Sequence, residues 1–483
     1  MYSCQKEDDI LEQTLISQYP TEGIMKLGKQ LENPYSVENM SKASNNLKKK
    51  GGSAKSSGGE IEIKTTHLYV KFMPKNEDEL SILKRDSTFV LYDYPLDYEI
   101  EENGYFYRDP EVPDGQPTYQ YCAIKVNKEL PSSVENEILA ELFIPDEDND
   151  DETISKKAFS YDNVNTLVDE ALRMTNNLPN IDSQNQKSLF RRRSKWRPAG
   201  TIRVWDDNLS RWVGVEGVEV RARRWFTTHK GIANSSGYYS CDGRFRREAN
   251  YSIDWERYHF ALRDGWLNGA TYNGPKKRGN WNLNLNSGKQ EYYATIFRAA
   301  YHYYYKNIKG FRRPPKNSFW KTQLKIRAYN ESNNDINGSH CPSCRFLGIG
   351  SAIKMYNPQR NSRDIYGTVI HELAHASHWS MDRSSYRNSS TIVAESWARG
   401  VQWELTRMIY SDYVTPYFTN YTGVVQDMID GISGYDQVSG YNIRQIEDAL
   451  NGQSSWVGWR NNIKNRYNNG TENNLEALFN HWD

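Results

Sequence analysis

The sequence predicts a multidomain α+β protein, and three observations support this fold class. The chain has 483 residues, which is enough for two to four domains. Short strands follow one another without helices from about residue 199 to 264, whereas helices and strands are mixed on either side of that region. Residues 39–60 contain almost nothing to bury. We therefore predict four segments: an N-terminal tail with a flexible linker at 1–60, a small α/β module at 61–195, an antiparallel β-sandwich at 196–286, and an α+β domain at 287–483.

The composition bears on the kinds of partner that the chain can bind. Lys plus Arg and Asp plus Glu are both 61, so the formal net charge is zero. A neutral chain has no global attraction to nucleic acid or to an anionic membrane. No stretch approaches the roughly 18 consecutive apolar residues that cross a bilayer as a helix. We therefore expect no nucleic-acid partner and no membrane-spanning helix.

The tail begins with MYSCQKEDD, in which Cys4 precedes a polar, acidic run. This start resembles the mature end of a bacterial lipoprotein, where the cysteine is acylated. In one large Gram-negative phylum a similar Lys-plus-acidic tag directs the protein to the cell surface. Only three residues precede Cys4, so the charged and apolar parts of a signal peptide are missing. Either the sequence begins after a truncated signal, or the likeness is accidental. A short helix is expected within residues 6–31.

The α/β module has strands with alternating apolar residues and helices with apolar residues at helical spacing. The order of its strands and helices resembles that of many protease pro-domains. The alternative interpretation is that the module is a structural spacer. The basic stretch LFRRRSKWRP at 189–198 is predicted to be a solvated linker. The predicted elements are a strand at 67–74, a helix at 76–85, strands at 87–95 and 118–126, and a helix at 132–143.

The sandwich is predicted from short strands that alternate with turns. The segments GVEGVEVRAR at 214–223 and ANSSGYYS at 233–240 resemble the transthyretin-like (carboxypeptidase-regulatory-like) domains that accompany carboxypeptidases and surface proteins of Gram-negative bacteria. This resemblance covers roughly 65 residues. It implies a scaffold or docking module without catalysis of its own.

The last domain opens with a long aromatic helix at 289–308, in which we expect His302 to be packed rather than to bind a metal. It is followed by two strands and then by a second helix around residues 366–380, a third at 391–409 and further helices such as 441–450. The strands lie at 323–330 and 351–358. The mixture predicts an α+β domain.

The second of these helices contains the motif His371-Glu372-Leu-Ala-His375. Residues four apart lie on one face of a helix, so both imidazoles can bind one metal ion. Glu372 lies on the flank, where its carboxylate can reach water rather than the metal. The alternative is an ordinary helix with two surface histidines. The motif favours a zinc site with Glu372 as its base.

Zinc needs a third protein ligand. In the metzincin form of this motif, the third ligand is a histidine at position 381, preceded by glycine at 378. This sequence has His378 and Met381 instead, so it does not follow that form. Glu395 lies on a following helix with 19 residues between it and His375, and Ser390 or Thr391 can cap that helix. This arrangement resembles the gluzincins, the thermolysin-like zinc metallopeptidases, over residues 320–410.

The gluzincin resemblance implies zinc on His371, His375 and Glu395, with Glu372 activating a water molecule. It also implies a zincin-like fold for residues 287–483. Where thermolysin-type enzymes carry an aspartate that supports a histidine ligand, this chain has Arg399. His371 therefore needs another carboxylate or carbonyl as its partner. His378 is expected to lie outside the ligand set, lining the cleft or supporting a ligand.

Three further features bear on the site. The segment GIGSAIKMYNP at 348–358 is either an edge strand that pairs with an extended peptide substrate or plain core sheet. Tyr435, Tyr441 and other C-terminal tyrosines are candidates for stabilising an oxyanion, and the sequence alone does not choose among them. Cys341 and Cys344 lie in a C-x-x-C, for which we favour a local disulfide over a redox or second zinc site.

Together these observations predict a zinc metallopeptidase that acts on protein or peptide substrates. The alternative is a surface protein that binds protein or glycan, with a structural zinc site and no catalysis. The lipoprotein-like start predicts the cell envelope, at the outer membrane or cell surface, and the alternatives are a periplasmic or a secreted protein. Membrane contact is expected only through a lipid on Cys4.

Overall fold

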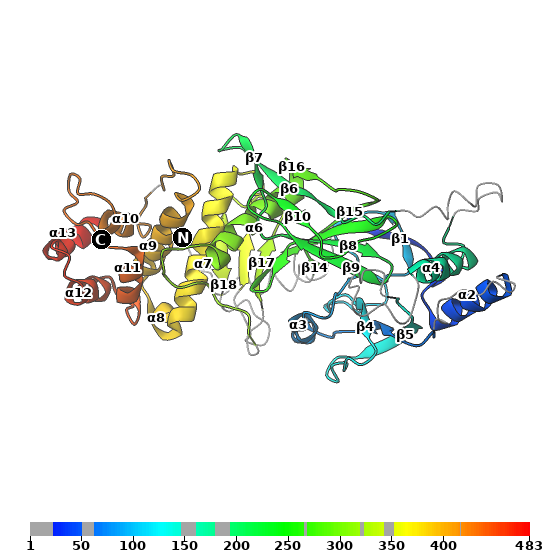
Figure 1. Ribbon diagram of the computed structural model, residues 1–483. Helices are drawn as coiled ribbons and strands as arrows, with labels where there is room; N and C mark the ends of the chain where they lie inside the picture. The colour runs from blue at the N-terminus through cyan, green and yellow to red at the C-terminus, as the bar shows by residue number, and fades with distance from the viewer. Residues whose placement is uncertain are drawn as a thin grey trace.

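A computed structural model describes residues 23–50, 62–145, 161–178, 194–264, 268–318, 323–341, 352–415 and 417–483. The protein is mixed α+β, with several antiparallel sheets and many helices. Figure 1 shows an elongated molecule: a blue and cyan module lies at one end, green sheets lie in the middle, and a group of helices lies at the other end. None of the helices in the described ranges combines the length and the apolar character needed to cross a bilayer.

The N-terminal module contains a three-stranded antiparallel sheet with the strand order β4-β2-β5. The predicted strand at 67–74 and helix at 76–85 are confirmed, and so is the strand at 118–126. In this module the bounds are β1 Lys26–Gln30, α2 Val37–Lys50, β2 His67–Phe72, α3 Glu77–Arg85, β3 Tyr98–Glu102, β4 Gln120–Lys125, β5 Asn136–Leu142 and α4 Tyr161–Met174.

Two predicted elements of this module are wrong. The predicted helix at 132–143 is strand β5, which pairs with β2 from His67↔Leu142 to Phe72↔Asn136. Pairing with a neighbouring strand has overridden the local helical spacing of its apolar residues. The predicted strand at 87–95 forms only an isolated bridge between Tyr92 and Tyr121.

The predicted linker and N-terminal helix also need correction. Residues 37–50 form α2, which packs against α4, because Met40, Ala43 and Leu47 recur at helical spacing in an otherwise polar stretch. Within 23–31, where we expected helix, the chain forms strand β1. The α/β module therefore begins before residue 61.

Residues 199–285 contribute two four-stranded sheets that share one buried core, which we call the sandwich. One sheet has the order β10-β6-β16 with β7 beside β6, and the other has the order β15-β11-β8-β9. Its pairs are antiparallel, as predicted, except that β16 runs parallel to β6. The bounds are β6 Ala199–Asp206, β7 Arg211–Gly214, β8 Glu219–Arg224, β9 Thr227–Ile232, β10 Tyr238–Ser240, β11 Ala249–Asp254, β15 Thr271–Lys277 and β16 Leu283–Leu285.

A six-stranded sheet, ordered β12-β13-β17-β19-β18 with β14 beside β13, crosses the predicted domain boundary at residue 286. Strand β13, which we assigned to the sandwich, runs parallel to β17. All five residues of β13 are buried, whereas burial alternates along β6. Burial on both faces is typical of parallel strands covered by helices. The bounds are β12 Glu256–Arg257, β13 Phe260–Asp264, β14 Asn268–Gly269, β17 Leu324–Ala328, β18 Gly338–Cys341 and β19 Ala352–Met355.

The helices of the last domain agree with the predicted ones. The long aromatic helix is α6, and its His302 is buried, with Nδ1 2.6 Å from the Tyr366 hydroxyl. His302 is therefore packed, as predicted. The bounds are α6 Gly288–Tyr305, α7 Ser362–Met381, α8 Arg383–Asn388, α9 Thr391–Thr406, α10 Val424–Ile429, α11 Ile443–Leu450, α12 Trp456–Arg466 and α13 Leu475–Trp482.

The turn after β6 connects the sandwich to the helices of the last domain. Asp206 is fully buried and accepts hydrogen bonds from Arg298 Nη1 at 3.0 Å, the Tyr410 hydroxyl at 2.7 Å and the Leu209 backbone N–H at 3.1 Å. Arg298 belongs to α6, and Tyr410 follows α9. A buried carboxylate with these partners holds the two parts together, because removing it leaves the Arg298 guanidinium without its carboxylate.

We expect Asp206→Ala to lower the free energy of unfolding by about 3–5 kcal/mol, because it leaves a buried charge without its partner. Urea denaturation of both proteins, followed by tryptophan fluorescence, measures the difference. The control is Asp412→Ala, since the Asp412 side chain is 81% exposed and pairs with Arg363 at the surface. That variant should stay within about 1 kcal/mol of the wild type. Equal losses in the two variants would contradict this role of Asp206.

A candidate metal centre between two helices

The helix that carries the motif, α7, is held at its N-terminus by side chains from two parts of the chain. The Asn361 side chain accepts a hydrogen bond from the Asp364 N–H, as an N-cap residue does. From the sandwich, Asp207 accepts from the Ser362 N–H and Asn208 from the Arg363 N–H, both at 2.8 Å. These bonds satisfy donors that a helix leaves unpaired in its first turn. The sandwich therefore fixes the position of α7.

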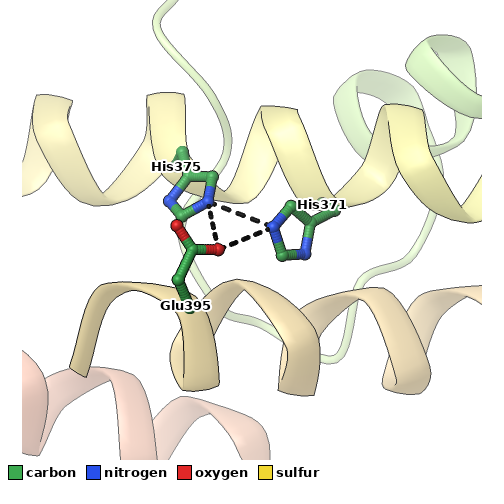
Figure 2. Close-up of side chains that lie close together, drawn as sticks. All are labelled: His371, His375 and Glu395. Carbon is green, nitrogen blue, oxygen red and sulfur yellow. Dashed lines mark hydrogen bonds and ion pairs between the residues drawn. The ribbon is translucent and has the colours of Figure 1, made fainter. Parts of the chain in front are cut away.

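Helix α9 runs beside α7 and supplies the third side chain of the centre (Figure 2). His371 Nε2 lies 3.1 Å from Glu395 Oε2, His375 Nε2 lies 3.2 Å from the same oxygen, and the two Nε2 atoms lie 3.1 Å apart. Ser390 occupies the N-cap position of α9 but makes no side-chain capping bond. The three side chains that the sequence singled out as ligands thus converge on one point.

These separations fit a zinc ion. Zinc bonds to imidazole nitrogen and carboxylate oxygen are about 2.0–2.2 Å long, so two ligand atoms at adjacent corners of a tetrahedron lie about 3.3 Å apart. The ligand-atom distances of 3.1, 3.1 and 3.2 Å are close to that value. The chemistry of the set also fits, because two imidazoles and one carboxylate are ligands of catalytic zinc sites.

Two of the three side chains of the centre, His371 and Glu395, are held in charge states that suit a cation, whereas Glu395 raises the pKa of His375 against the effect of burial. Burial lowers the pKa of His371 to about 4, which keeps its imidazole neutral near pH 7. Burial alone would raise the pKa of Glu395, but the neighbouring His375 and His371 hold it well below its ordinary value. Metal ligands must be neutral imidazole and ionised carboxylate. For His371 and Glu395, the protein environment favours those states.

The Glu372 side chain lies beside the three converging ligand atoms but contributes none of them. Its side chain is buried, and burial together with the charge of Glu395 raises its pKa to about 7, although His375 and the His340 N–H oppose this shift. Strand β18 lies against it, and a Cβ atom at Gly338 would be 3.0 Å from Glu372 Oε1. Glycine at 338 therefore allows the strand to lie directly over this carboxylate.

The edge of the sheet at the centre is β18, not the segment 348–358 that we considered as an edge strand. Strand β19, which contains residues 352–355 of that segment, lies between β17 and β18. Strand β18 pairs antiparallel with β19, and its other side has no strand partner in the described ranges. Of our two alternatives for this segment, the core sheet is therefore the right one for residues 352–355.

His378 is buried one turn beyond His375, and the described part of the chain offers no hydrogen-bond partner to either of its ring nitrogens. Burial lowers its pKa to about 3. Its ring contacts Tyr386 edge to face, with centroids 5.0 Å apart. His378 is absent from the group whose ligand atoms converge. This placement outside the ligand set agrees with our expectation.

The sequence analysis did not single out Tyr421. Its ring stacks on His371 at 5.9 Å between centroids, and burial, together with the nearby charge of Glu395, raises the pKa of the Tyr421 hydroxyl. The Arg399 guanidinium lies 5.0 Å from the centre of the Tyr421 ring. No motif marks Tyr421, since it lies in a loop whose position depends on the fold of the last domain.

The two tyrosines that we named for an oxyanion lie elsewhere. The Tyr435 hydroxyl is bonded to Asp427 at 3.1 Å, and its ring stacks on His481. The Tyr441 backbone N–H is bonded to Met428, and in the described ranges its hydroxyl has no partner. Neither makes a described contact with the converging side chains, whereas Tyr421 stacks on His371 and Tyr386 meets His375 edge to face.

We expected a carboxylate or carbonyl to accept a hydrogen bond from the second ring nitrogen of His371, and the described residues offer none. The Nδ1 atoms of both His371 and His375 are buried there without a hydrogen-bond partner. Metal-binding histidines usually donate this N–H to a carboxylate or a carbonyl.

The cysteines are only partly described. Cys341 at the end of β18 is disulfide-bonded. Cys344 and Cys4 lie outside the residues that the structure describes, so the pairing of Cys341 with Cys344 and the acylation of Cys4 stay predictions. Cys122 and Cys241 are buried free thiols.

A second group of side chains, Asp427, Asp430 and Asp436, also brings oxygens within 4.8 Å of one another. Asp427 already accepts hydrogen bonds from Trp482 Nε1 at 2.8 Å and from Tyr435. The group contains no histidine. Structural hydrogen bonds account for Asp427, and we assign the group no chemistry.

The described part of the N-terminal module does not cover the centre. Its described side chains contact the sandwich and the β12–β13 end of the six-stranded sheet, for example through Lys84–Glu256 at 2.7 Å and Arg263–Glu77 at 3.0 Å. Figure 1 places this blue and cyan module at the opposite end of the molecule from α9. The described part of the module therefore does not lie where a pro-domain that covers the centre would lie.

Comparison of the chain with family models, with curated proteins and with solved structures found no significant match.

Proposed function

We propose that the protein is a zinc-dependent metallopeptidase of gluzincin type. One observation carries this proposal: His371 Nε2, His375 Nε2 and Glu395 Oε2 converge at distances of 3.1–3.2 Å, with the buried carboxylate of Glu372 beside them. A purely structural zinc site has no use for an additional carboxylate. A catalytic site needs one as a general base.

His371, His375 and Glu395 would hold the ion and leave its fourth position open. Zinc supplies a Lewis acid that polarises a peptide carbonyl and acidifies water. Glu372 takes a proton from the attacking water and delivers it to the leaving amine. Tyr421 packs against the His371 ring, and in this proposal its hydroxyl, which lies near Glu395, helps to position that carboxylate. Its phenol is a candidate donor for the developing oxyanion.

The proposed substrate is an extended protein or peptide segment. Strand β18 is an edge of the six-stranded sheet and lies directly against Glu372. An exposed edge accepts another strand through backbone hydrogen bonds. A peptide paired with β18 would therefore pass beside the base and the metal ligands. Neither nucleic acid nor a spanned membrane has a role in this proposal.

We also keep the cell envelope as the proposed location, with acylation of Cys4 as the anchor. The cysteine and the acidic run after it support this idea, and so does the likeness of residues 214–240 to transthyretin-like surface modules. Mass spectrometry of the native protein isolated from membranes tests it. A mass increase on the N-terminal peptide is expected, and an unmodified Cys4 thiol would remove the anchor.

Cleavage of a peptide library tests the proposed activity. The purified chain should cut peptides, lose activity with a chelator and regain it with added zinc. Cleavage that resists chelation would contradict a metallopeptidase. One equivalent of bound zinc without cleavage would favour the alternative, a surface binding protein with a structural zinc site.

The role of Tyr421 gives a further prediction. In this proposal the Tyr421 hydroxyl donates a hydrogen bond to Glu395. Tyr421→Phe removes that donor, and loss of such a supporting bond typically weakens metal affinity or activity about 10–100-fold. We expect the zinc dissociation constant, measured by competition with a chromophoric chelator, to rise about tenfold or more. Tyr435→Phe is the control, because that tyrosine bonds to Asp427 instead. Equal zinc affinities for the two variants would contradict the positioning role.

A further inference from the structure

A cleft of about 720 Å³ lies between the N-terminal module and the sandwich, away from the candidate metal centre. Strands β2 and β4 of the module form one wall, and residues 224–229 around the β8–β9 turn form the other. Pockets of roughly 300–1,000 Å³ are the size that holds small organic ligands. No residue of the metal centre lines this cleft, so it needs an explanation of its own.

The inner surface of the cleft is largely aromatic. Tyr35, Tyr92, Phe226 and Phe245 line it, and each is more than nine-tenths buried. The Phe226 ring meets Tyr35 edge to face at 6.3 Å, which links the module to the sandwich, and Phe245 packs on His229 at 4.6 Å. Rigid aromatic walls of this kind suit a flat or branched apolar body.

The charged residues in the lining are all cationic. Lys125, Lys128, Arg224 and Arg244 line the cleft, and none of the twenty lining residues is Asp or Glu. Lys128 is neutralised by Asp86 at 2.5 Å. Lys125 and Arg224 have no ion pair within the described ranges. His67 also lines the cleft, and its pKa is lowered by its own burial and by the positive charge of Lys125.

We propose that this cleft binds a small amphipathic anion, whose apolar body packs against Tyr35, Phe226 and Phe245 and whose anionic head is held by Lys125 and Arg224. A neutral apolar ligand would leave two cations uncompensated at the edge of an aromatic surface. A hydrophilic anion would make no use of the aromatic lining. Only a ligand with both properties satisfies both parts of the lining.

The test uses the full chain and two fluorescent probes. The anionic probe is 8-anilino-1-naphthalenesulfonate, and the neutral probe is N-phenyl-1-naphthylamine, which has the same aromatic body without the sulfonate. In the Lys125→Gln/Arg224→Gln double variant, we expect the dissociation constant of the anionic probe to rise about tenfold or more, the loss expected for charge-assisted bonds. The neutral probe should bind both proteins within about twofold, which also shows that the aromatic walls stay folded.

Lys29→Gln is the matched control, because the Lys29 side chain is 74% exposed and lies in the same module outside the cleft. Its affinity for the anionic probe should equal that of the wild type. Equal affinity of the double variant would overturn the proposal, and so would failure of the wild type to bind the anionic probe.

A third variant identifies the competing occupant. The run DEDNDDE at 146–152 follows the lining residue Pro145 and contains six acidic residues. If the anionic probe binds only after these six are changed to their amides, the chain's own acidic segment is the occupant and the small-anion proposal is wrong. If the amide variant and the wild type bind the probe alike, the proposal stands.

Discussion

Glu372→Gln should retain zinc and lose hydrolysis. Glutamine is nearly isosteric with glutamate and leaves both imidazoles of α7 in place, but it cannot accept a proton from water. Loss of one general base typically lowers the rate by roughly 10²–10⁴-fold. Single-turnover cleavage of the best peptide from the library measures the rate, and metal analysis after dialysis measures the zinc.

The matched control for this variant is Glu476→Gln, because the Glu476 side chain is 66% exposed and belongs to the C-terminal helix α13. Its turnover should equal that of the wild type. If Glu372→Gln turns over at a near-normal rate with full zinc, Glu372 is not the base and the proposed chemistry is wrong.

Glu395→Ala should lose zinc, whereas His378→Ala should keep it. Glu395 Oε2 lies 3.1 Å and 3.2 Å from the two Nε2 atoms, so its removal takes away one of three ligands and the only anionic one. His378 lies on the same helix as both histidine ligands and outside the converging group. One side of a tetrahedral site must come from an opposing element, and α9 is that element.

Zinc analysis after dialysis compares these two variants directly. The expected result is less than a tenth of an equivalent in Glu395→Ala and close to one equivalent in His378→Ala, since loss of an anionic ligand also removes charge that neutralises the ion. The reverse pattern, with zinc retained in Glu395→Ala and lost in His378→Ala, would rule out the gluzincin arrangement.

The approach of His371, His375 and Glu395 could be predicted because it depends on two local facts. Helical spacing places the histidines on one face, and the short polar segment between α7 and α9, which forms helix α8 rather than a loop, lets α9 return beside α7. Tyr421 could not be predicted, since it reaches the centre from a loop placed by contacts such as that of Thr422 with Ser396. Long-range packing leaves no signal in one sequence.

The errors in the fold have the same origin. Strand β5 has helical spacing of its apolar residues but is a strand because β2 lies beside it. Strand β13 follows the sandwich in sequence, yet it pairs with β17 of the last domain, so the domain boundary predicted at 286 divides a sheet. Helix α2 was missed because few of its residues are apolar, although Met40 and Ala43 are fully buried. In each case the deciding contact is distant along the chain.

The central claim is that one zinc ion is bound by His371, His375 and Glu395. The most direct test is a crystal of the full chain grown with zinc, with anomalous diffraction recorded on both sides of the zinc absorption edge. The account predicts one strong peak about 2.0–2.2 Å from His371 Nε2, His375 Nε2 and a Glu395 carboxylate oxygen. A zinc peak held by other residues, with none between these three side chains, would contradict it.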